Sequence, residues 1–220
     1  MADTARRLTG LTAAAEALAV LTVQPSLSQP SPPPPRPVDF GRAASLGDAA
    51  AARPPGTAAA EGEGAQQNRR QDPSPRRIVV PGAGLDARVR PVGVDGQGSV
   101  AVPADPSVAG WYRFGPAPGS TEGSAVLVGH VDGDTGALGE FAALYDVRPG
   151  DRIEVRRAGA RPVGYRVVSR STVPRRELPP SVFRRTGSPV LTLVTCAPPF
   201  VPERGGYQSN LVVTARPLPS

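Results

Sequence analysis

The feature that most constrains the fold is a series of short apolar runs, which glycine and proline interrupt roughly every 8 to 15 residues from about residue 76 onward. These runs are rich in valine, leucine and isoleucine and are typical of β-strands. Only residues 138–145 show helical spacing. Many short strands without alternating helices predict an all-β barrel or sandwich with one or two short helices. The candidate strands are residues 77–80, 88–94, 99–102, 110–112, 124–130, 151–156, 163–172, 190–196 and 210–215.

The candidate strands differ in how much of their surface they bury. Residues 152–156 alternate charged and apolar side chains, which predicts a strand with one face in solvent. Val126, Leu127 and Val128 form an unbroken apolar run, which predicts a strand buried on both faces. The sheet is therefore expected to contain both kinds of strand.

Composition divides the chain near residue 75. Residues 25–75 are rich in proline, alanine and glycine, and Phe40 is the only aromatic residue before residue 76. Such a stretch cannot bury enough apolar surface to offset the entropy lost on ordering, so we expect a disordered linker. Residues 76–220 hold the other aromatic residues and every convincing strand. Their length, about 145 residues, is enough for one hydrophobic core.

Residues 1–24 are a candidate signal or membrane-anchor segment. Arg6 and Arg7 precede the mildly apolar run 8–23, as in an export signal, but Glu16 lies in the middle of that run. A charge near the centre of a spanning helix costs about 2.5–3.5 kcal/mol on insertion. An uncleaved signal-anchor, a degraded export signal, an amphipathic helix and a soluble alanine-rich helix therefore stay open. With an anchor, the proline-rich linker would hold the domain away from a membrane.

Charge and cysteine content exclude several classes of function. The net charge is +6, and all 25 basic residues are arginines. They lie in scattered pairs without interleaved aromatic residues, so nucleic-acid binding is not expected. One cysteine excludes an internal disulfide, and one cysteine with one histidine does not favour a four-ligand zinc site. We therefore expect no metal.

The single cysteine and the single histidine each follow an apolar run. His130 ends the run 124–130, and Cys196 ends the run 189–196, before a predicted loop that begins at Ala197. Taken separately, a lone cysteine is often a small buried side chain and a lone histidine is often structural. Together, at two predicted strand ends, they have what a thiol nucleophile with a proton-transfer partner requires. We therefore expect His130 and Cys196 to be catalytic residues.

Several motifs in a fixed order carry a family resemblance. Two of them are Ala125-Val-Leu-Val-Gly-His-Val-Asp132 and Leu191-Thr-Leu-Val-Thr-Cys196, which contain the histidine and the cysteine. The others are residues 77–86, 92–103, 110–119 and 144–151. These motifs make residues 76–217 resemble the sortase family and, within it, the class F type of high-GC Gram-positive bacteria.

The resemblance implies a closed eight-stranded β-barrel and a catalytic domain at residues 76–220. It also implies an extracytoplasmic, membrane-associated transpeptidase that cleaves surface proteins at a C-terminal sorting signal of the Leu-Pro-x-Thr-Gly kind. Cys196 would form a thioacyl-enzyme, and His130 would protonate the leaving amine. An amine acceptor, such as a cell-wall precursor peptide, would resolve the thioester without any cofactor. The loop at residues 174–187 is expected to influence specificity.

One position departs from the family pattern. Sortases place an arginine shortly after the cysteine, where it binds substrate and stabilises the oxyanion, and class F relatives often show Tyr-Arg-Asp-Asn there. Here Gln208 and Ser209 stand in place of the Arg and Asp. Asn210 is a neutral substitute, and Arg204 and Arg113 are charged candidates. The missing arginine supports a second hypothesis, a sortase-fold protein that binds a peptide or cell-wall component with weak or no turnover. A third is a structural β-domain in which the histidine and the cysteine only pack.

Overall fold

The computed structural model describes residues 38–41, 72–133 and 136–219. The candidate signal or anchor segment at residues 1–24 lies outside these residues, as does most of the predicted linker at 25–75. The described elements, in chain order, are β1 (Pro75–Val80), η1 (Pro81–Ala83), β2 (Leu85–Val92), β3 (Val108–Tyr112), β4 (Ser124–Val128), η2 (Glu140–Tyr145), β5 (Arg152–Arg157), β6 (Ala160–Pro174), η3 (Arg175–Glu177), η4 (Pro180–Phe183), β7 (Val190–Val201), η5 (Pro202–Arg204) and β8 (Gly206–Pro217), where η marks a short 3-10 helix.

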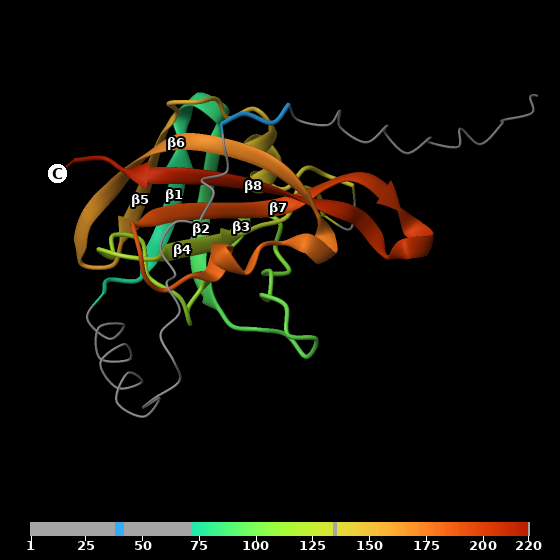
Figure 1. Cartoon of the computed structure of the whole chain (residues 1–220), viewed down its shortest axis with the longest axis horizontal. Helices are drawn as coiled ribbons and strands as arrows, with labels where there is room; N and C mark the ends of the chain where they lie inside the picture. Colours follow the sequence, from blue (N-terminus) through green and yellow to red (C-terminus); the bar gives the residue numbers. More distant parts are fainter. Residues whose placement is uncertain (1–37, 42–71, 134–135, 220) are drawn as a thin grey trace, which may run out of the picture. The chain divides into compact units, whose positions relative to one another are not determined.

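The strands close into one barrel in the order β1-β2-β3-β4-β7-β8-β6-β5, with β5 pairing back to β1. The pairs β2–β3 and β4–β7 are parallel, and the other neighbours are antiparallel. Figure 1 shows β6, β7 and β8 running side by side across the barrel. The prediction of an all-β closed eight-stranded barrel with few helices is confirmed.

Alternating side chains on each strand fill the barrel. On β7, for example, Leu191, Leu193 and Ala197 are fully buried and belong to the main core. Their counterparts on β8 are Leu211, Val213 and Ala215. Because successive side chains on a strand point to opposite faces, the residues between them face the outside of the barrel.

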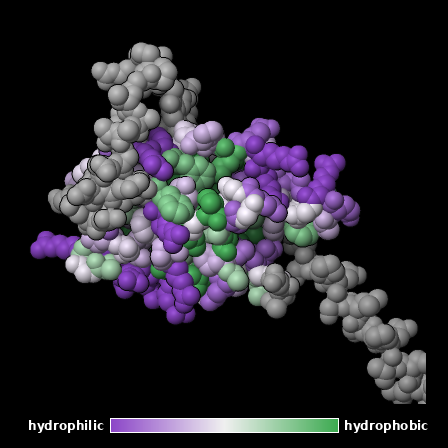
Figure 2. All heavy atoms as spheres, turned by 90° about the horizontal axis from the view of Figure 1, so that it is seen from below, coloured by the Kyte–Doolittle hydropathy of each residue, from purple (hydrophilic) through white to green (hydrophobic). Residues whose placement is uncertain are grey.

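The outward positions of β4, β7 and β8 carry a second group of buried apolar side chains, which we call the outer valine cluster. It consists of Val126, Val128, Val182, Val194 and Val212. Val182 comes from η4, so this short helix covers the outside of the sheet there. The predicted burial of residues 126–128 on both faces is therefore confirmed. On the face shown in Figure 2, hydrophobic residues gather near the middle among hydrophilic ones.

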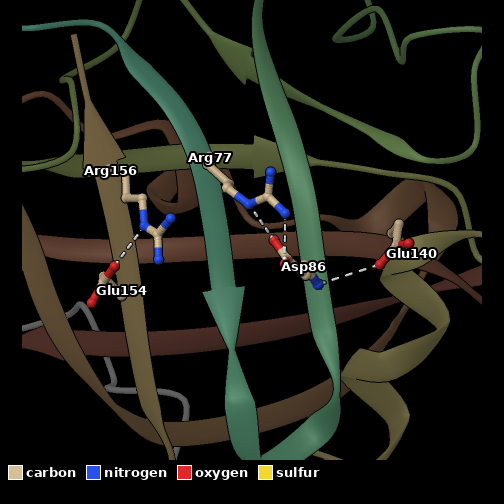
Figure 3. A network of polar contacts seen from close by, with 5 residues as sticks. All are labelled: Arg77, Asp86, Glu140, Glu154 and Arg156. Carbon is tan, nitrogen blue, oxygen red and sulfur yellow. Dashed lines mark hydrogen bonds and ion pairs between the residues drawn. The ribbon is translucent and has the colours of Figure 1, made fainter.

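The outward positions of β1, β2 and β5 are charged (Figure 3). The guanidinium of Arg77 pairs with Asp86 at 2.5 and 2.7 Å, and that of Arg156 pairs with Glu154 at 2.8 Å. The backbone N–H of Asp86 also donates to Glu140 on η2 at 3.3 Å. This side of the barrel faces solvent, as the alternation in residues 152–156 predicts.

Two strand predictions are wrong. Residues 99–102 form no strand but only an isolated bridge between Val94 and Val100, because the Asp95 carboxylate accepts two backbone N–H bonds in a tight turn instead. The loop predicted from Ala197 is part of β7, which runs on to Val201. Prolines inside a strand are tolerated at irregularities, and the β7–β8 pairing shifts register between Ala197 and Phe200. Cys196 therefore lies within a strand rather than at its end.

A short segment of the predicted linker contacts the barrel. Phe40 exchanges two backbone hydrogen bonds of 2.9 Å with Arg170 on β6, and its ring lies 5.0 Å from the Arg170 guanidinium. Arg170 is buried, with 6% of the residue exposed, and its guanidinium donates to the carbonyls of Val38 and Val147, among others. Among residues 38–41, 72–133 and 136–219, no helix is both long and apolar enough for a membrane span.

Candidate active site

The pairing of β4 with β7 places the predicted histidine beside the predicted cysteine. The two strands are parallel, and their register runs from Ser124 opposite Val190 to Val128 opposite Val194. Beyond the end of β4, the Gly129 N–H donates to the Val194 carbonyl at 3.2 Å, and the Thr195 hydroxyl donates to the Gly129 carbonyl at 2.9 Å. Because the chains stay adjacent at this point, the next residue of each, His130 and Cys196, meet across the ladder.

The side chain of Cys196 points to the outside of the barrel. Its neighbours Thr195 and Ala197 are buried and point inward, whereas Val194 belongs to the outer valine cluster. On β8, Asn210 lies directly opposite Cys196. The thiol is half-buried and lies at one end of the outer valine cluster. It is therefore not sealed in the core.

The imidazole of His130 is half-buried, and its contacts define which nitrogen can exchange a proton. Nε2 lies 2.9 Å from the carbonyl oxygen of Pro103. Because a carbonyl only accepts, Nε2 carries the hydrogen of the neutral ring and Nδ1 is the basic nitrogen. Within the described part of the chain, no hydrogen bond joins the imidazole to the thiol. The backbone of His130 is fixed by η2, where the Phe141 N–H donates to its carbonyl at 3.2 Å.

Three further residues lie in this neighbourhood that the sequence interpretation does not single out. The Tyr145 hydroxyl donates to the Cys196 carbonyl at 2.8 Å, which ties η2 to β7. The Tyr207 hydroxyl donates to Asp132 at 2.6 Å and so links β8 to the chain just after the histidine. Burial raises the pKa of both tyrosines, so both stay protonated donors at neutral pH. Their sequence signal is that Tyr145 and Asp132 fall within the family motifs and that Tyr207 matches the first residue of the Tyr-Arg-Asp-Asn pattern.

The electrostatics of the site favour a protonated thiol at rest. Burial raises the pKa of the Cys196 thiol; the guanidinium of Arg175 lowers it, and the carboxylate of Asp132 raises it further. The net shift is upward. A thiol whose pKa is raised in this way stays protonated at neutral pH.

The polar residues proposed for the missing arginine have different surroundings. The side-chain amide of Gln208 donates to the Gly206 and Arg204 carbonyls at 2.6 and 3.4 Å, so it stabilises the β7–β8 turn. Arg204 is exposed on η5 within this turn. The Arg113 guanidinium lies 4.9 Å from the ring centre of Phe114, next to β3. Of the neutral candidates, Asn210 is the one directly opposite the cysteine.

Comparisons with known proteins agree with this fold. In solved structures, the chain is similar to sortase C1 from Streptococcus agalactiae at 21% identity and a TM-score of 0.51, with 66% of this chain and 67% of that chain covered. It is also similar to sortase C-1 from Actinomyces oris at 22% identity and a TM-score of 0.52, with 76% and 83% covered. A search of curated proteins finds no match. The family model for the sortase domain matches residues 78–218, which is more than half of the chain, and the protein therefore belongs to the sortase family.

Proposed function

We propose that the protein is a cysteine transpeptidase of the class F sortase type, which cleaves a Leu-Pro-x-Thr-Gly-like sorting signal and transfers it to an amine. The observation that carries the proposal is the β4–β7 register, which brings His130 next to the outward-facing Cys196. The class F assignment rests on the sequence motifs, since the similar solved structures are class C sortases below 25% identity.

The first half of the proposed reaction forms a thioester. His130 takes the proton of the Cys196 thiol, and the sulfur attacks the threonine carbonyl carbon, which moves an electron pair onto the carbonyl oxygen. The oxyanion then collapses and the peptide C–N bond breaks. The proton held by His130 passes to the departing glycine amine. The acyl group stays on sulfur, and the imidazole returns to its neutral form.

The second half transfers the acyl group. An incoming amine loses a proton to His130 as its nitrogen attacks the thioester carbon. When the C–S bond breaks, the thiolate recovers that proton from the imidazole. A new amide forms, and both residues return to their starting states. The upward shift of the thiol pKa suits this cycle, since it makes the sulfur a ready proton acceptor at the end.

The surroundings of the thiol support a peptide substrate. The outer valine cluster extends from Cys196 along β7 and β8 and is bordered by half-buried Val173, Leu178 and Phe183. The valines themselves are buried beneath η4, and the half-buried residues at their border offer an apolar contact for a small aliphatic side chain of an extended peptide bound upstream of the scissile bond. In keeping with a sorting role, we propose that the domain works outside the cytoplasm and that its acceptor is a cell-wall precursor amine.

A second candidate function has one observation in its favour. Gln208 stands where the family pattern has an arginine, and its amide is engaged in the turn. A protein that lacks oxyanion stabilisation loses roughly 10²–10³ in rate, which would leave a binder of sorting signals or wall components with weak turnover.

Trapping the acyl-enzyme separates the two functions. The full chain is incubated with an acetylated Leu-Pro-Ala-Thr-Gly peptide, and intact mass reports an adduct that maps to Cys196, the only cysteine. Hydroxylamine should release the acyl group as a hydroxamate, because it attacks thioesters without needing an acceptor site. Cys196→Ala should give no adduct, and His130→Ala should form it about 10²- to 10⁴-fold more slowly.

Two results would decide against the transpeptidase. A peptide complex that is stable but never cleaved would favour the binding protein. Equal adduct formation in His130→Ala and wild type would remove the imidazole from the reaction. Circular dichroism and the thermal midpoint of each variant establish that the loss is chemical, since neither residue belongs to the main core.

A further inference from the structure

We propose that Arg175 supplies the positive charge that stabilises the thiolate and the oxyanion at Cys196, in place of an arginine at position 208. The part of the inference that concerns the oxyanion rests on the proposed function. The part that concerns the thiolate does not. It assigns a charge-stabilising role to a residue on η3, at the end of β6, outside the strand that follows the cysteine.

The strand register brings Arg175 to the same face as the thiol. Along β8, Asn210 pairs with Cys196 on one side and with Val173 on the other. One step further, Ser209 pairs with Ala197 and with Pro174. Residues directly opposite one another share a face, and residues two apart on a strand return to it. Beyond this pair β6 gives way to η3, and the side chains of Arg175 and Gln208 both donate to carbonyls of the turn that joins β7 to β8.

A hydrogen bond holds Arg175 over β8. Its Nη1 donates to the Gly205 carbonyl at 3.3 Å, in the turn that joins β7 to β8. The side chain thus reaches from the β6 side of β8 toward β7, the strand that carries the cysteine. It is otherwise exposed, which leaves room for a substrate carbonyl to approach the guanidinium.

Among the residues that the structure describes, Arg175 is the cation whose charge lowers the pKa of the thiol. The groups around the sulfur are His130 after β4, Asp132 beyond it, Tyr145 on η2, Tyr207 on β8 and Arg175 on η3. Of these, Asp132 and Arg175 carry the charges that influence the pKa of the thiol, the first raising it and the second lowering it. Without Arg175, a developing negative charge on the sulfur would face the Asp132 carboxylate without the guanidinium that opposes it.

The thiolate half of the proposal can be tested without any substrate. Because the chain has one cysteine, the rate of alkylation by iodoacetamide, followed by intact mass, reports on Cys196 alone. Removing a positive charge raises the thiol pKa, so Arg175→Ala should react several-fold more slowly at neutral pH. The pH profile of its alkylation rate should move to higher pH, while the rate reached on the plateau at high pH stays unchanged. Arg176→Ala, which removes a neighbouring exposed arginine, is the matched control and should coincide with wild type.

The oxyanion half is tested by turnover of the Leu-Pro-Ala-Thr-Gly peptide. Arg175→Ala should lower kcat/KM about tenfold or more, because a donor to the oxyanion is lost. Arg175→Lys should recover part of the loss. Gln208→Arg in the Arg175→Ala background should also restore turnover, because both side chains reach adjacent carbonyls of the β7–β8 turn. A structural role for Arg175 predicts no rescue by a charge at position 208.

The outcomes separate this inference from the proposed function. If the alkylation profile of Arg175→Ala matches that of Arg176→Ala, the inference is overturned, whatever the turnover. If Arg204→Ala instead shifts the profile, the cation is Arg204 and the inference is again wrong. A shift in Arg175→Ala together with no peptide cleavage by wild type supports the thiolate assignment and overturns the transpeptidase.

Discussion

Two outer faces of the same barrel differ sharply. On β1, β2 and β5, outward positions carry Arg77, Asp86, Glu154 and Arg156, which pair with one another in solvent (Figure 3). On β4, β7 and β8, the equivalent positions carry the outer valine cluster under η4. The inward faces of both sets are equally apolar. The strands of the barrel thus need apolar side chains only on their inward face. Apolar side chains on the outward face mark where another element covers the sheet.

The proposed catalytic residues lie at the border of the covered face. Cys196 continues the row of Val194 and is only half-buried, because η4 covers the valines and not the cysteine. A thiol there is desolvated enough to stay protonated and open enough to meet a peptide. The same residue on the charged face would be solvated, and in the core it would be out of reach.

The largest effect is expected from placing a charge on each face. Val194 is 7% exposed, so Val194→Lys buries an unpaired ammonium and should lower the free energy of unfolding by about 2–4 kcal/mol. Val79→Lys is the matched control on β1, where Asp86 and Glu154 are its neighbours across the ladders. It should change stability by less than about 0.5 kcal/mol. Urea denaturation measures both, and equal losses would contradict the difference between the faces.

The sequence predicts the two faces from local pattern alone. The unbroken run 126–128 predicts a strand with two apolar faces, and the alternation 152–156 predicts a strand with one. Both predictions are confirmed. The proline pair after Cys196 predicts the end of the strand, and this prediction is wrong. The pairing of β7 with β8 is irregular at the prolines and then continues. No local sequence pattern distinguishes such an irregularity from a loop.

The contacts within the site depend on long-range register and are less predictable. The proximity of His130 and Cys196 follows from the family resemblance, but β5 and β6 separate β4 from β7 in the chain. The position of Arg175 near the β7–β8 turn depends on how β6 pairs with β8, so no local pattern around the cysteine predicts it. The contact of Tyr145 with the Cys196 carbonyl joins a helical segment to a strand 51 residues later.

A smaller effect is expected from a methyl group at the edge of the covered face. A Cβ added to Gly129 would lie 2.5 Å from Cγ of Phe141, a core ring on η2. Gly129→Ala must therefore displace η2 or the end of β4, at a cost of about 1–3 kcal/mol. Since η2 fixes the His130 backbone and contacts the Cys196 carbonyl, alkylation and turnover should change as well.

The control for this variant is Gly96→Ala in the hairpin after β2. A Cβ there meets nothing within 4 Å, and the residue has no positive φ. Its free energy of unfolding should stay within about 0.5 kcal/mol of wild type. If the two alanine variants are equally stable and equally reactive toward iodoacetamide, close packing of β4 against η2 does not position the histidine.

The smallest effect is expected on the charged face. The Arg77 and Asp86 side chains are 42% and 48% exposed, so water competes with their ion pair and salt screens it. The pair lowers the pKa of Asp86 below its usual value, and its stabilising effect is lost as the pH falls through that lowered pKa. Arg77→Ala should leave the thermal midpoint at neutral pH nearly unchanged in high salt and lower it only slightly in low salt. A large, salt-independent loss would mean that Arg77 packs against its neighbours through its aliphatic stem, and the two outer faces would then differ less in their packing than in their charge.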